Sequence, residues 1–414
     1  MKFEDYHIEP AIKRSLATLQ FRRPTDIQYK AIPHILKGED VLAIAQTGTG
    51  KTAAFAIPII NLLQRTKSSR RSDGIKCVVM VPTHELAIQI AEVFQQIGKH
   101  TLVKSLGLFG GVEQEPQIAQ LNKGIDVLIA TPGRLFDLRS QGHLHLDRVE
   151  VLVLDEADHM LDLGFLKDIQ DLRRHLPRQR QTLFFSATID EKIKKLAYSL
   201  VSKPIRIQIS PKDPVAKNID HAVAFVEMDD KRFFLERIVK AQPGKKILVF
   251  VRTKVRAERV HKAMARVDIP SLTLHGDKDQ KKRMSTMQEF KQGQVKLLIA
   301  TDVSARGIDI PQVEYVINYD LPEVVENYVH RVGRTGRGKH RGQAISFCSS
   351  GEKAHLEAIE SYLDKPIARW HIDKETYTET LTSSQESHSD WKTLMRKAEE
   401  EDQAYKARKR KKKR

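Results

Sequence analysis

One short stretch limits the possible folds of this chain more than any other. Residues 149–154 form an apolar, largely β-branched run, and carboxylates follow it immediately at Asp155, Glu156 and Asp158. Apart from Glu150 the run is apolar, which is typical of a strand buried on both faces, as in a parallel sheet covered by helices. The sequence therefore predicts a rigid strand that delivers carboxylates to the edge of such a sheet. Taken alone, the stretch is also compatible with a strand followed by an acidic helix start.

A glycine-rich loop upstream favours the more specific interpretation. Gly48, Gly50, Lys51 and Thr52 follow an apolar run at 41–45. Glycines allow backbone N–H groups to face phosphates, the lysine reaches their charge, and the hydroxyl suits magnesium. The strict phosphate-loop motif has glycine at the position where this chain has Ala45. An ordinary glycine-rich turn is the alternative interpretation of this loop.

The glycine-rich loop at 48–52 and the acidic run at 155–158 together predict a binding site for nucleotide phosphates. Asp155 is expected to hold a Mg²⁺ ion with Thr52, and Glu156 is expected to polarise an attacking water.

Short apolar runs alternate with helical periods along most of the chain, which predicts parallel strands joined by helical crossovers. The expected strands are at 41–45, 77–81, 105–109, 126–130, 149–154 and 182–185, and again at 222–226, 246–251, 271–274, 295–300, 313–318 and 343–347.

The two halves also share sequence in register. Residues 128–131 (LIAT) recur at 298–301, and 81–83 (VPT) is matched at the same offset by 251–253 (VRT). We therefore expect duplicated lobes, with a phosphate loop only in the first. The expected organisation is a nucleotide-binding lobe at 1–209, a proline-containing linker at 210–218, a second lobe at 219–370 and a polar, basic, disordered tail at 371–414.

The net charge of the chain indicates what kind of partner it binds. Among 414 residues, 70 Lys and Arg outnumber 53 Asp and Glu, giving a formal charge of +17, and such an excess favours a polyanion such as nucleic acid.

Cys77 and Cys348 lie far apart within apolar runs and are expected to be buried thiols. No apolar run approaches the roughly 20 residues that span a bilayer, so a soluble, cytoplasmic protein without a membrane partner is expected.

The loop at 45–52 together with Asp155–Glu156–Ala157–Asp158 resembles the DEAD-box family of ATP-dependent RNA helicases, and the similarity extends over about residues 3–350. The resemblance implies two tandem RecA-like domains and the cofactors ATP and Mg²⁺. The basic tail is most similar to that of the bacterial RhlE-like branch.

The resemblance also implies individual ATP contacts. Residues 21–28 are similar to the family's Q motif, in which Gln28 reads the adenine edge and an upstream aromatic, Phe3, stacks on the base. Gln20 and Asp26 depart from the family pattern, but neither supplies the adenine contact. The remaining implied ATP contacts are Ala45, Gln46, Thr47, Gly48, Thr49, Gly50, Lys51, Thr52 and, from the second lobe, Asp309.

Further motifs resemble the family's RNA-contacting segments. The implied contacts are Pro82, Thr83, Gly110, Gly111, Thr131 and Arg134 in the first lobe, and Arg252, Thr253, Arg283 and Thr301 in the second. Hydroxyls, exposed N–H groups at helix starts and arginines suit a phosphate backbone. The family usually has arginine where His84 stands, which puts one charge-assisted contact in doubt.

The last group of motifs is implied to couple the two lobes. Arg334 and Arg337 resemble arginine fingers that act on the γ-phosphate, although a solvated basic face is the alternative for this segment. Asp158, Ser186, Thr188, Gln280 and Arg331 are the implied coupling residues. For Ser186 and Thr188 a plain helix cap is an equally good interpretation.

The implied function is RNA-stimulated ATP hydrolysis that closes the lobes and separates short RNA duplexes locally, without processive movement. A DNA-directed motor of the same superfamily and an ATP-gated RNA clamp without unwinding are the alternatives. A monomer is expected, with ribosomal or RNA-degradation assemblies as candidate partners.

Overall fold

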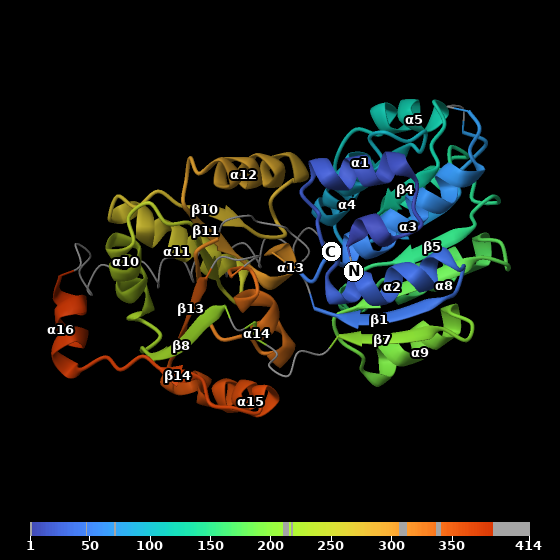
Figure 1. Ribbon diagram of the computed structural model, residues 1–414. Helices are drawn as coiled ribbons and strands as arrows, with labels where there is room; N and C mark the ends of the chain where they lie inside the picture. Colours follow the sequence, from blue (N-terminus) through green and yellow to red (C-terminus); the bar gives the residue numbers. More distant parts are fainter. Residues whose placement is uncertain are drawn as a thin grey trace. The chain divides into compact units, whose positions relative to one another are not determined.

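The computed structural model describes residues 2–46, 48–69, 72–209, 215, 216, 218–305, 313–336 and 341–383, with the backbone alone for Val303 and Ala305. The chain divides into two compact units near residue 217, and each is a sheet covered by helices (Figure 1). The predicted linker, residues 306–312 and 337–340, and the basic tail lie wholly or largely outside the described residues.

The first lobe contains a parallel sheet in the order β3-β4-β2-β5-β6-β1-β7. Its strands are β1 (Val41–Ala45), β2 (Cys77–Met80), β3 (Ser105–Leu108), β4 (Val127–Ala130), β5 (Val151–Leu154), β6 (Gln181–Ser186) and β7 (Ile205–Ile209). The helical elements are η1 (Phe3–Asp5), α1 (Pro10–Thr18), α2 (Asp26–Leu36), α3 (Lys51–Thr66), α4 (His84–Ile97), α5 (Glu115–Asn122), α6 (Pro132–Ser140), α7 (Ala157–Asp162), α8 (Leu166–His175) and α9 (Glu191–Leu200).

The second lobe contains a parallel sheet in the order β10-β11-β9-β12-β13-β8-β14. Its strands are β8 (Ile219–Phe225), β9 (Ile247–Phe250), β10 (Leu272–Leu274), β11 (Leu297–Ala300), β12 (Tyr315–Asn318), β13 (Gly342–Cys348) and β14 (Ala368–Arg369). Its helical elements are α10 (Lys231–Ala241), α11 (Lys254–Arg266), α12 (Gln280–Gln292), α13 (Asp302–Ala305), α14 (Val325–Val332), η2 (Ser350–Glu352), α15 (Lys353–Leu363) and α16 (Lys374–Thr382).

The two sheets have the same strand order, since β1 to β7 correspond one by one to β8 to β14. The LIAT repeats end the equivalent strands β4 and β11, and the VPT and VRT segments follow the equivalent strands β2 and β9. The predictions of tandem RecA-like domains and of duplicated lobes are therefore confirmed.

The seventh strand of each sheet was missed by the sequence analysis. Strand β7 is an edge strand with a half-exposed, alternating pattern, and β14 is an edge strand of two residues. Neither produces the continuous apolar run that marks a strand buried on both faces. The twelve expected runs correspond to the other twelve strands.

Both faces of the first sheet are buried, which explains the uninterrupted apolar strands. On one face Val41, Ala43 and Ala45 pack with α1 to α4, and on the other Leu42 and Ile44 pack with α6 to α9. All four residues of β5 are buried, as predicted for the strand that carries the acidic run. Burial on both faces makes this strand a rigid support for the residues that follow it.

The folded part of the chain extends beyond residue 370, where the polar tail was expected to begin. Helix α16 packs against α10, with the Tyr377 ring 4.9 Å from that of Phe234 and its hydroxyl donating to Asp230 at 2.7 Å. One aromatic residue thus anchors a helix that is otherwise polar. Composition alone did not reveal this contact.

Cys77 and Cys348 are buried free thiols, as predicted, and burial raises the pKa of Cys348 to about 11. Within the described ranges, no helix is both long enough and apolar enough to cross a membrane.

Candidate functional site

The predicted nucleotide residues follow three neighbouring strands. Strands β5, β6 and β1 are adjacent in the sheet and parallel. Their carboxyl ends therefore meet at one edge, where 155–158 follows β5, 186–188 ends and follows β6, and 46–52 follows β1. Ligands of open parallel sheets bind at this edge. The fold thus brings together motifs that lie more than a hundred residues apart in the sequence.

The loop after β1 has the backbone of a phosphate loop. Gly48 and Gly50 have φ of 80° and 92°, a left-handed conformation that favours glycine. Helix α3 begins at Lys51, so its free N–H groups and the positive end of its dipole lie at the loop. Thr49 donates through its hydroxyl to the Gln46 carbonyl at 2.8 Å. Thr47 lies outside the described residues.

Lys51 and Asp155 form a buried pair of opposite charges at the base of this edge. Lys51 is 6% exposed and donates from Nζ to the Ala45 carbonyl at 3.0 Å. Burial raises the pKa of Asp155 to about 6, with Lys51 opposing the change and Glu156 adding to it. A cation beside this carboxylate would reverse the effect, because it would favour the ionised form.

Glu156 has a strained backbone and a buried side chain. Its φ is 53°, in the left-handed region that non-glycine residues rarely adopt. Its N–H donates to Asp155 Oδ1 at 3.0 Å, and its Oε2 lies 3.4 Å from Nδ1 of the buried His159. Strain of this kind persists where the surrounding contacts determine the conformation, and it gathers at functional sites.

Asp158 connects the acidic run to the segment after β6. Its Oδ2 accepts hydrogen bonds from the Ala187 N–H at 3.0 Å, the Thr188 N–H at 3.1 Å and the Thr188 hydroxyl at 3.3 Å. The neighbouring Ser186 is fully buried, and its hydroxyl has no partner within the described part of the protein. A displacement at either segment is therefore transmitted to the other.

Gln28 holds the start of α2 against the phosphate loop. Its Oε1 accepts from the Thr25 N–H at 2.9 Å, and its Nε2 donates to the Gly50 carbonyl at 3.1 Å. A Cβ on Gly50 would lie 2.5 Å from this Nε2 and would displace the Gln28 amide, and the positive φ of Gly50 also favours glycine. Phe3 is 3% exposed and lies against Tyr6 and Phe21, whereas Phe21 is 38% exposed.

The predicted RNA residues of the first lobe follow the other three neighbouring strands, β3, β4 and β2. Gly110 and Gly111 follow β3, and Thr131 and Arg134 follow β4. Arg134 is held by a hydrogen bond from Nη2 to the Val112 carbonyl at 2.8 Å. The nucleotide residues and these residues therefore occupy adjacent halves of the same sheet edge.

The residues after β2 complete this second group. Pro82 is buried, and the Thr83 hydroxyl caps α4 by accepting from the Leu86 N–H at 3.3 Å. The ring of His84 lies 5.9 Å from that of Phe109. This helix-cap role of Thr83 is compatible with a phosphate contact by the N–H groups of the helix start.

In the second lobe, Arg252 and Thr253 follow β9, and Thr301 follows the adjacent strand β11. Thr253 caps α11 by accepting from the Arg256 N–H at 3.2 Å, which repeats the arrangement of Thr83 in the first lobe. Gln280 is the first residue of α12, and Arg283 on the same helix donates to the Ser304 hydroxyl at 3.2 Å.

Arg331 of α14 and Arg334 just after that helix do not belong to a solvated basic face, which was the alternative interpretation of this segment. Arg331 is 2% exposed and makes a two-pronged contact with Asp302, at 2.5 Å from Nε and 2.7 Å from Nη2. Arg334 is 4% exposed and donates from Nε to the His330 carbonyl at 3.1 Å. Asp309 and Arg337 lie outside the described residues.

The sequence analysis missed the residues that hold Arg252. Its Nη2 donates to Glu352 at 3.1 Å, and its N–H donates to Asp320 at 2.9 Å. The buried Lys231 lies 2.5 Å from the other oxygen of Glu352. Because these residues come from three distant segments, no local pattern signals them.

Two lobes of identical topology, with one phosphate loop beside one acidic strand end, define the class of the protein. It is a nucleotide-binding protein of the P-loop type with tandem RecA-like domains. Family models agree lobe by lobe, since residues 25–196 match the DEAD/DEAH box helicase model and residues 230–339 match the helicase conserved C-terminal domain.

Similar proteins identify the family. The chain is 40% identical to the DEAD-box ATP-dependent RNA helicase RhpA of Helicobacter pylori, over 89% of this chain and 74% of the relative. It is 38% identical to the ATP-dependent RNA helicase RhlB of Shewanella oneidensis, over 94% and 89%. The chain therefore belongs to the DEAD-box family of ATP-dependent RNA helicases, and it is an ATP-hydrolysing enzyme.

Solved structures agree with this assignment. S. cerevisiae Dbp5 bound to RNA and ADP BeF3 matches with a TM-score of 0.81 and 30% identity, over 92% of this chain and 98% of that one. Mss116 bound to single-stranded RNA and UDP-BeF matches with a TM-score of 0.80 and 30% identity, over 94% and 83%. Neither a DNA-directed motor nor a clamp without unwinding is favoured by these similarities.

Proposed function

We propose that the carboxyl edge of β1, β5 and β6 is the ATP site and that hydrolysis there drives local, non-processive separation of short RNA duplexes. The observation that carries this proposal is the convergence of Lys51, the acidic run and the 186–188 segment on one sheet edge. The first lobe's phosphate contacts are Ala45, Gln46, Thr47, Gly48, Thr49, Gly50, Lys51 and Thr52.

The residues present fit a magnesium ion. Mg²⁺ prefers oxygen ligands and is usually held by one or two protein groups, with phosphates and waters completing its shell. The half-buried Thr52 hydroxyl and the buried Asp155 carboxylate are such groups. When bound, the ion would neutralise phosphate charge, and Thr52 and Asp155 would hold it.

Glu156 is the proposed base that orients and polarises the attacking water. Its side chain is buried beside Asp155, and its left-handed backbone fixes the direction in which the carboxylate leaves the strand end. Preorganised groups of this kind lower the barrier because they need not reorganise during the reaction.

The second lobe supplies the positive charge that the first lobe lacks. Arg334 and Arg337 are the proposed arginine fingers, Asp309 is the proposed nucleotide contact, and Arg331 holds the segment through Asp302. Arginine contacts of this type raise the rate of hydrolysis by about 10³- to 10⁵-fold. Hydrolysis is therefore slow until ATP and RNA together close the lobes.

RNA is proposed to bind along the ends of β3, β4 and β2 in the first lobe and of β9 and β11 in the second. Its contacts would be made through phosphates, and 2′-hydroxyl contacts would favour RNA over DNA without reading sequence. Asp158, Ser186 and Thr188 would couple hydrolysis to RNA separation, since Asp158 joins the acidic run after β5 to the segment after β6. Gln280 would act with them from the second lobe.

The adenine contact is proposed to involve the residues expected from the sequence. Gln28 keeps its proposed role, because its amide is held at the phosphate loop. Phe3 keeps its proposed stacking role, and Phe21, whose ring lies beside that of Phe3 and is 38% exposed, is a second candidate for stacking on the base.

Glu156→Gln in the full chain tests the proposal. The variant should bind ATP and RNA with unchanged affinity, and RNA-stimulated phosphate release should fall at least 100-fold, because the amide cannot polarise water. Filter binding and a phosphate-release assay measure the two properties, and a short RNA duplex tests unwinding. Normal hydrolysis by the variant would remove Glu156 from the mechanism.

We further propose a first lobe at 1–209, a second lobe at 219–370 to which α16 adds, a monomeric state and a cytoplasmic location. We also propose that the protein belongs to the RhlE-like branch and works in ribosomal or RNA-degradation assemblies. RNA crosslinking in cells tests the last of these.

A further inference from the structure

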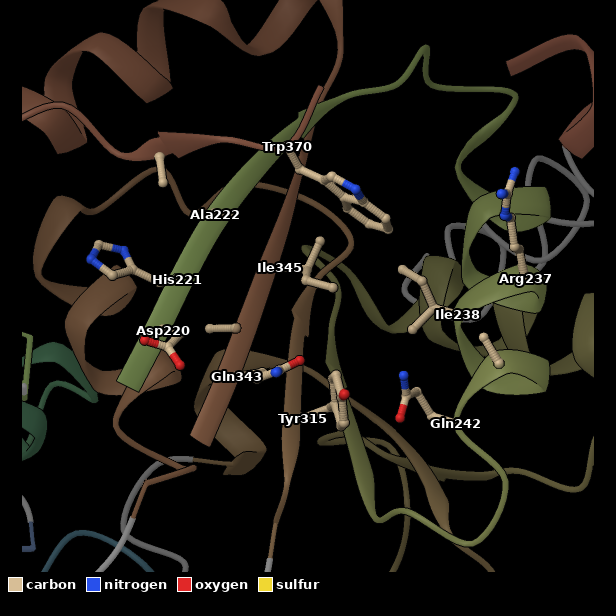
Figure 2. A pocket seen from close by; sticks show the side chains of 13 residues that line it. Asp220, His221, Ala222, Arg237, Ile238, Gln242, Tyr315, Gln343, Ile345 and Trp370 are labelled. Carbon is tan, nitrogen blue, oxygen red and sulfur yellow. The ribbon is translucent and has the colours of Figure 1, made fainter. Parts of the chain in front are cut away.

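The second lobe has an open groove on the sheet face that also carries α10. The groove has a volume of about 560 Å³ (Figure 2). Its floor is formed by Tyr315 and Ile345. One wall is formed by Trp370, and the other by Ile238 of α10 and by Gln242, which follows that helix. Trp370 is 38% exposed, and Tyr315 and Ile345 are half-buried.

The duplicated topology shows which element this groove lacks. In the first lobe, α2 lies beside α3 and across the equivalent strands β1 and β7 (Figure 1). It covers that face with Ile27, Ala31, Ile32 and Ile35, all buried. In the second lobe, α10 corresponds to α3, and β8 and β14 correspond to β1 and β7. Only residues 210–218 separate β7 from β8, which is too short for a helix like α2 and a connection.

The groove is therefore shaped for an amphipathic helix of about three turns, and the chain itself contains a suitable sequence. Trp391, Leu394, Met395 and Ala398 recur at i, i+3, i+4 and i+7, the spacing of one apolar helix face. These residues lie outside the described part of the chain.

The last described helix of the chain lies beside the groove. After Trp370, the chain crosses α10 as α16, and Arg237 of α10 donates to both the Thr376 carbonyl and the Thr380 hydroxyl. Arg237 also lines the groove. Trp391 lies eight residues beyond Ser383, the last described residue, a span of up to about 26 Å when extended. Tethering gives an effective concentration in the millimolar range, which favours this segment over a free partner.

We propose that residues 391–398 occupy the α10–Trp370 groove of the same molecule. Burial of the four apolar side chains would supply the driving force, and it would be opposed by the entropy cost of ordering the segment. The docked segment would complete the second lobe as α2 completes the first. Docking would also attach the segment that leads to the basic run 406–414 at a fixed point on that lobe.

The two tryptophans of the chain, Trp370 and Trp391, provide the test. In full-length Trp391→Phe protein, Trp370 is the sole reporter, and docking should shield it from acrylamide. Adding Leu394→Asp should raise its quenching constant about twofold. Thr393→Asp, which adds the same charge on the opposite helix face, should leave it unchanged.

A reciprocal measurement uses Trp370→Phe, which leaves Trp391 as the reporter. Ala241→Arg fills the groove from an exposed position of α10 and should raise the quenching of Trp391 about twofold. Both results should be independent of protein concentration. Equal quenching of Trp370 in the Leu394→Asp and Thr393→Asp proteins would overturn the proposal, as would shielding that disappears on dilution, which would indicate a second copy as the occupant.

Discussion

At the scale of single residues, the site depends on charged groups that are buried and held by the backbone. Lys51 donates to the Ala45 carbonyl, and the N–H of Glu156 donates to Asp155. Burying a charge is costly unless it is paired and hydrogen-bonded. These groups are therefore fixed before a ligand binds, and little reorganisation is needed when charge from phosphates enters the site.

Lys51→Ala is the clearest test at this scale. Loss of the ammonium should weaken ATP binding at least tenfold and abolish RNA-stimulated hydrolysis, because no other described cation of the first lobe replaces it at Asp155. Fluorescent-nucleotide titration and phosphate release measure these effects. The control is Lys30→Ala, an exposed lysine on α2. If Lys51→Ala bound ATP as the control does, the phosphate loop would not be the ATP site.

At the scale of elements, the second lobe is held together by ionic contacts between segments that are distant in sequence. Glu352, 2% exposed, accepts from Lys231 of α10, from Arg252 after β9, from the Leu321 N–H and from Ser349. One carboxylate thus fixes α10, the proposed RNA contact Arg252 and the start of α15 relative to each other.

Glu352→Gln should therefore destabilise the second lobe by about 3 kcal/mol, because it leaves the buried Lys231 without its closest counter-charge. Urea unfolding measures the loss. Adding Lys231→Met should recover much of it, since a buried ion pair can be replaced by apolar groups at little cost. Glu360→Gln is the control, because its partner Arg369 is largely exposed, and it should cost less than about 1 kcal/mol.

The same carboxylate predicts a pH dependence. Burial opposes ionisation, but Lys231 and the hydrogen bonds from Lys231 and Ser349 together hold the pKa of Glu352 below its ordinary value. Its stabilising effect is therefore present above the pKa of the unfolded state and is lost as pH falls through the lower folded-state value. The difference between wild type and Glu352→Gln should shrink below about pH 4. A constant difference across this range would contradict the ionic role.

At the scale of the whole molecule, the excess of positive charge matters more than any single contact. The formal charge of +17 includes eight lysines and arginines between 406 and 414. Such a run attracts RNA phosphates without reading sequence, and its contribution is screened by salt. It can therefore add affinity to the RNA contacts proposed for the two lobes.

Replacing residues 406–414 with uncharged residues should reduce the slope of log affinity against log salt. The expected reduction is about 0.7 for each phosphate that the basic run neutralises on single-stranded RNA. RNA binding measured across a salt series tests this, with hydrolysis at saturating RNA as a control that should be unchanged. An unaltered slope would mean that the run does not contact RNA.

Local patterns of period or spacing were enough to predict the strands buried on both faces, the phosphate loop, the acidic strand end and the duplication. The edge strands β7 and β14 and helix α16 were not predicted, since they lack a continuous apolar run or depend on one contact such as Tyr377 with Phe234. The folded structure was needed to show that β5, β6 and β1 are neighbours, that Phe3 is buried and Phe21 exposed, and that Glu352 holds Arg252. These facts depend on strand order and on packing between distant segments, and local periodicity encodes neither.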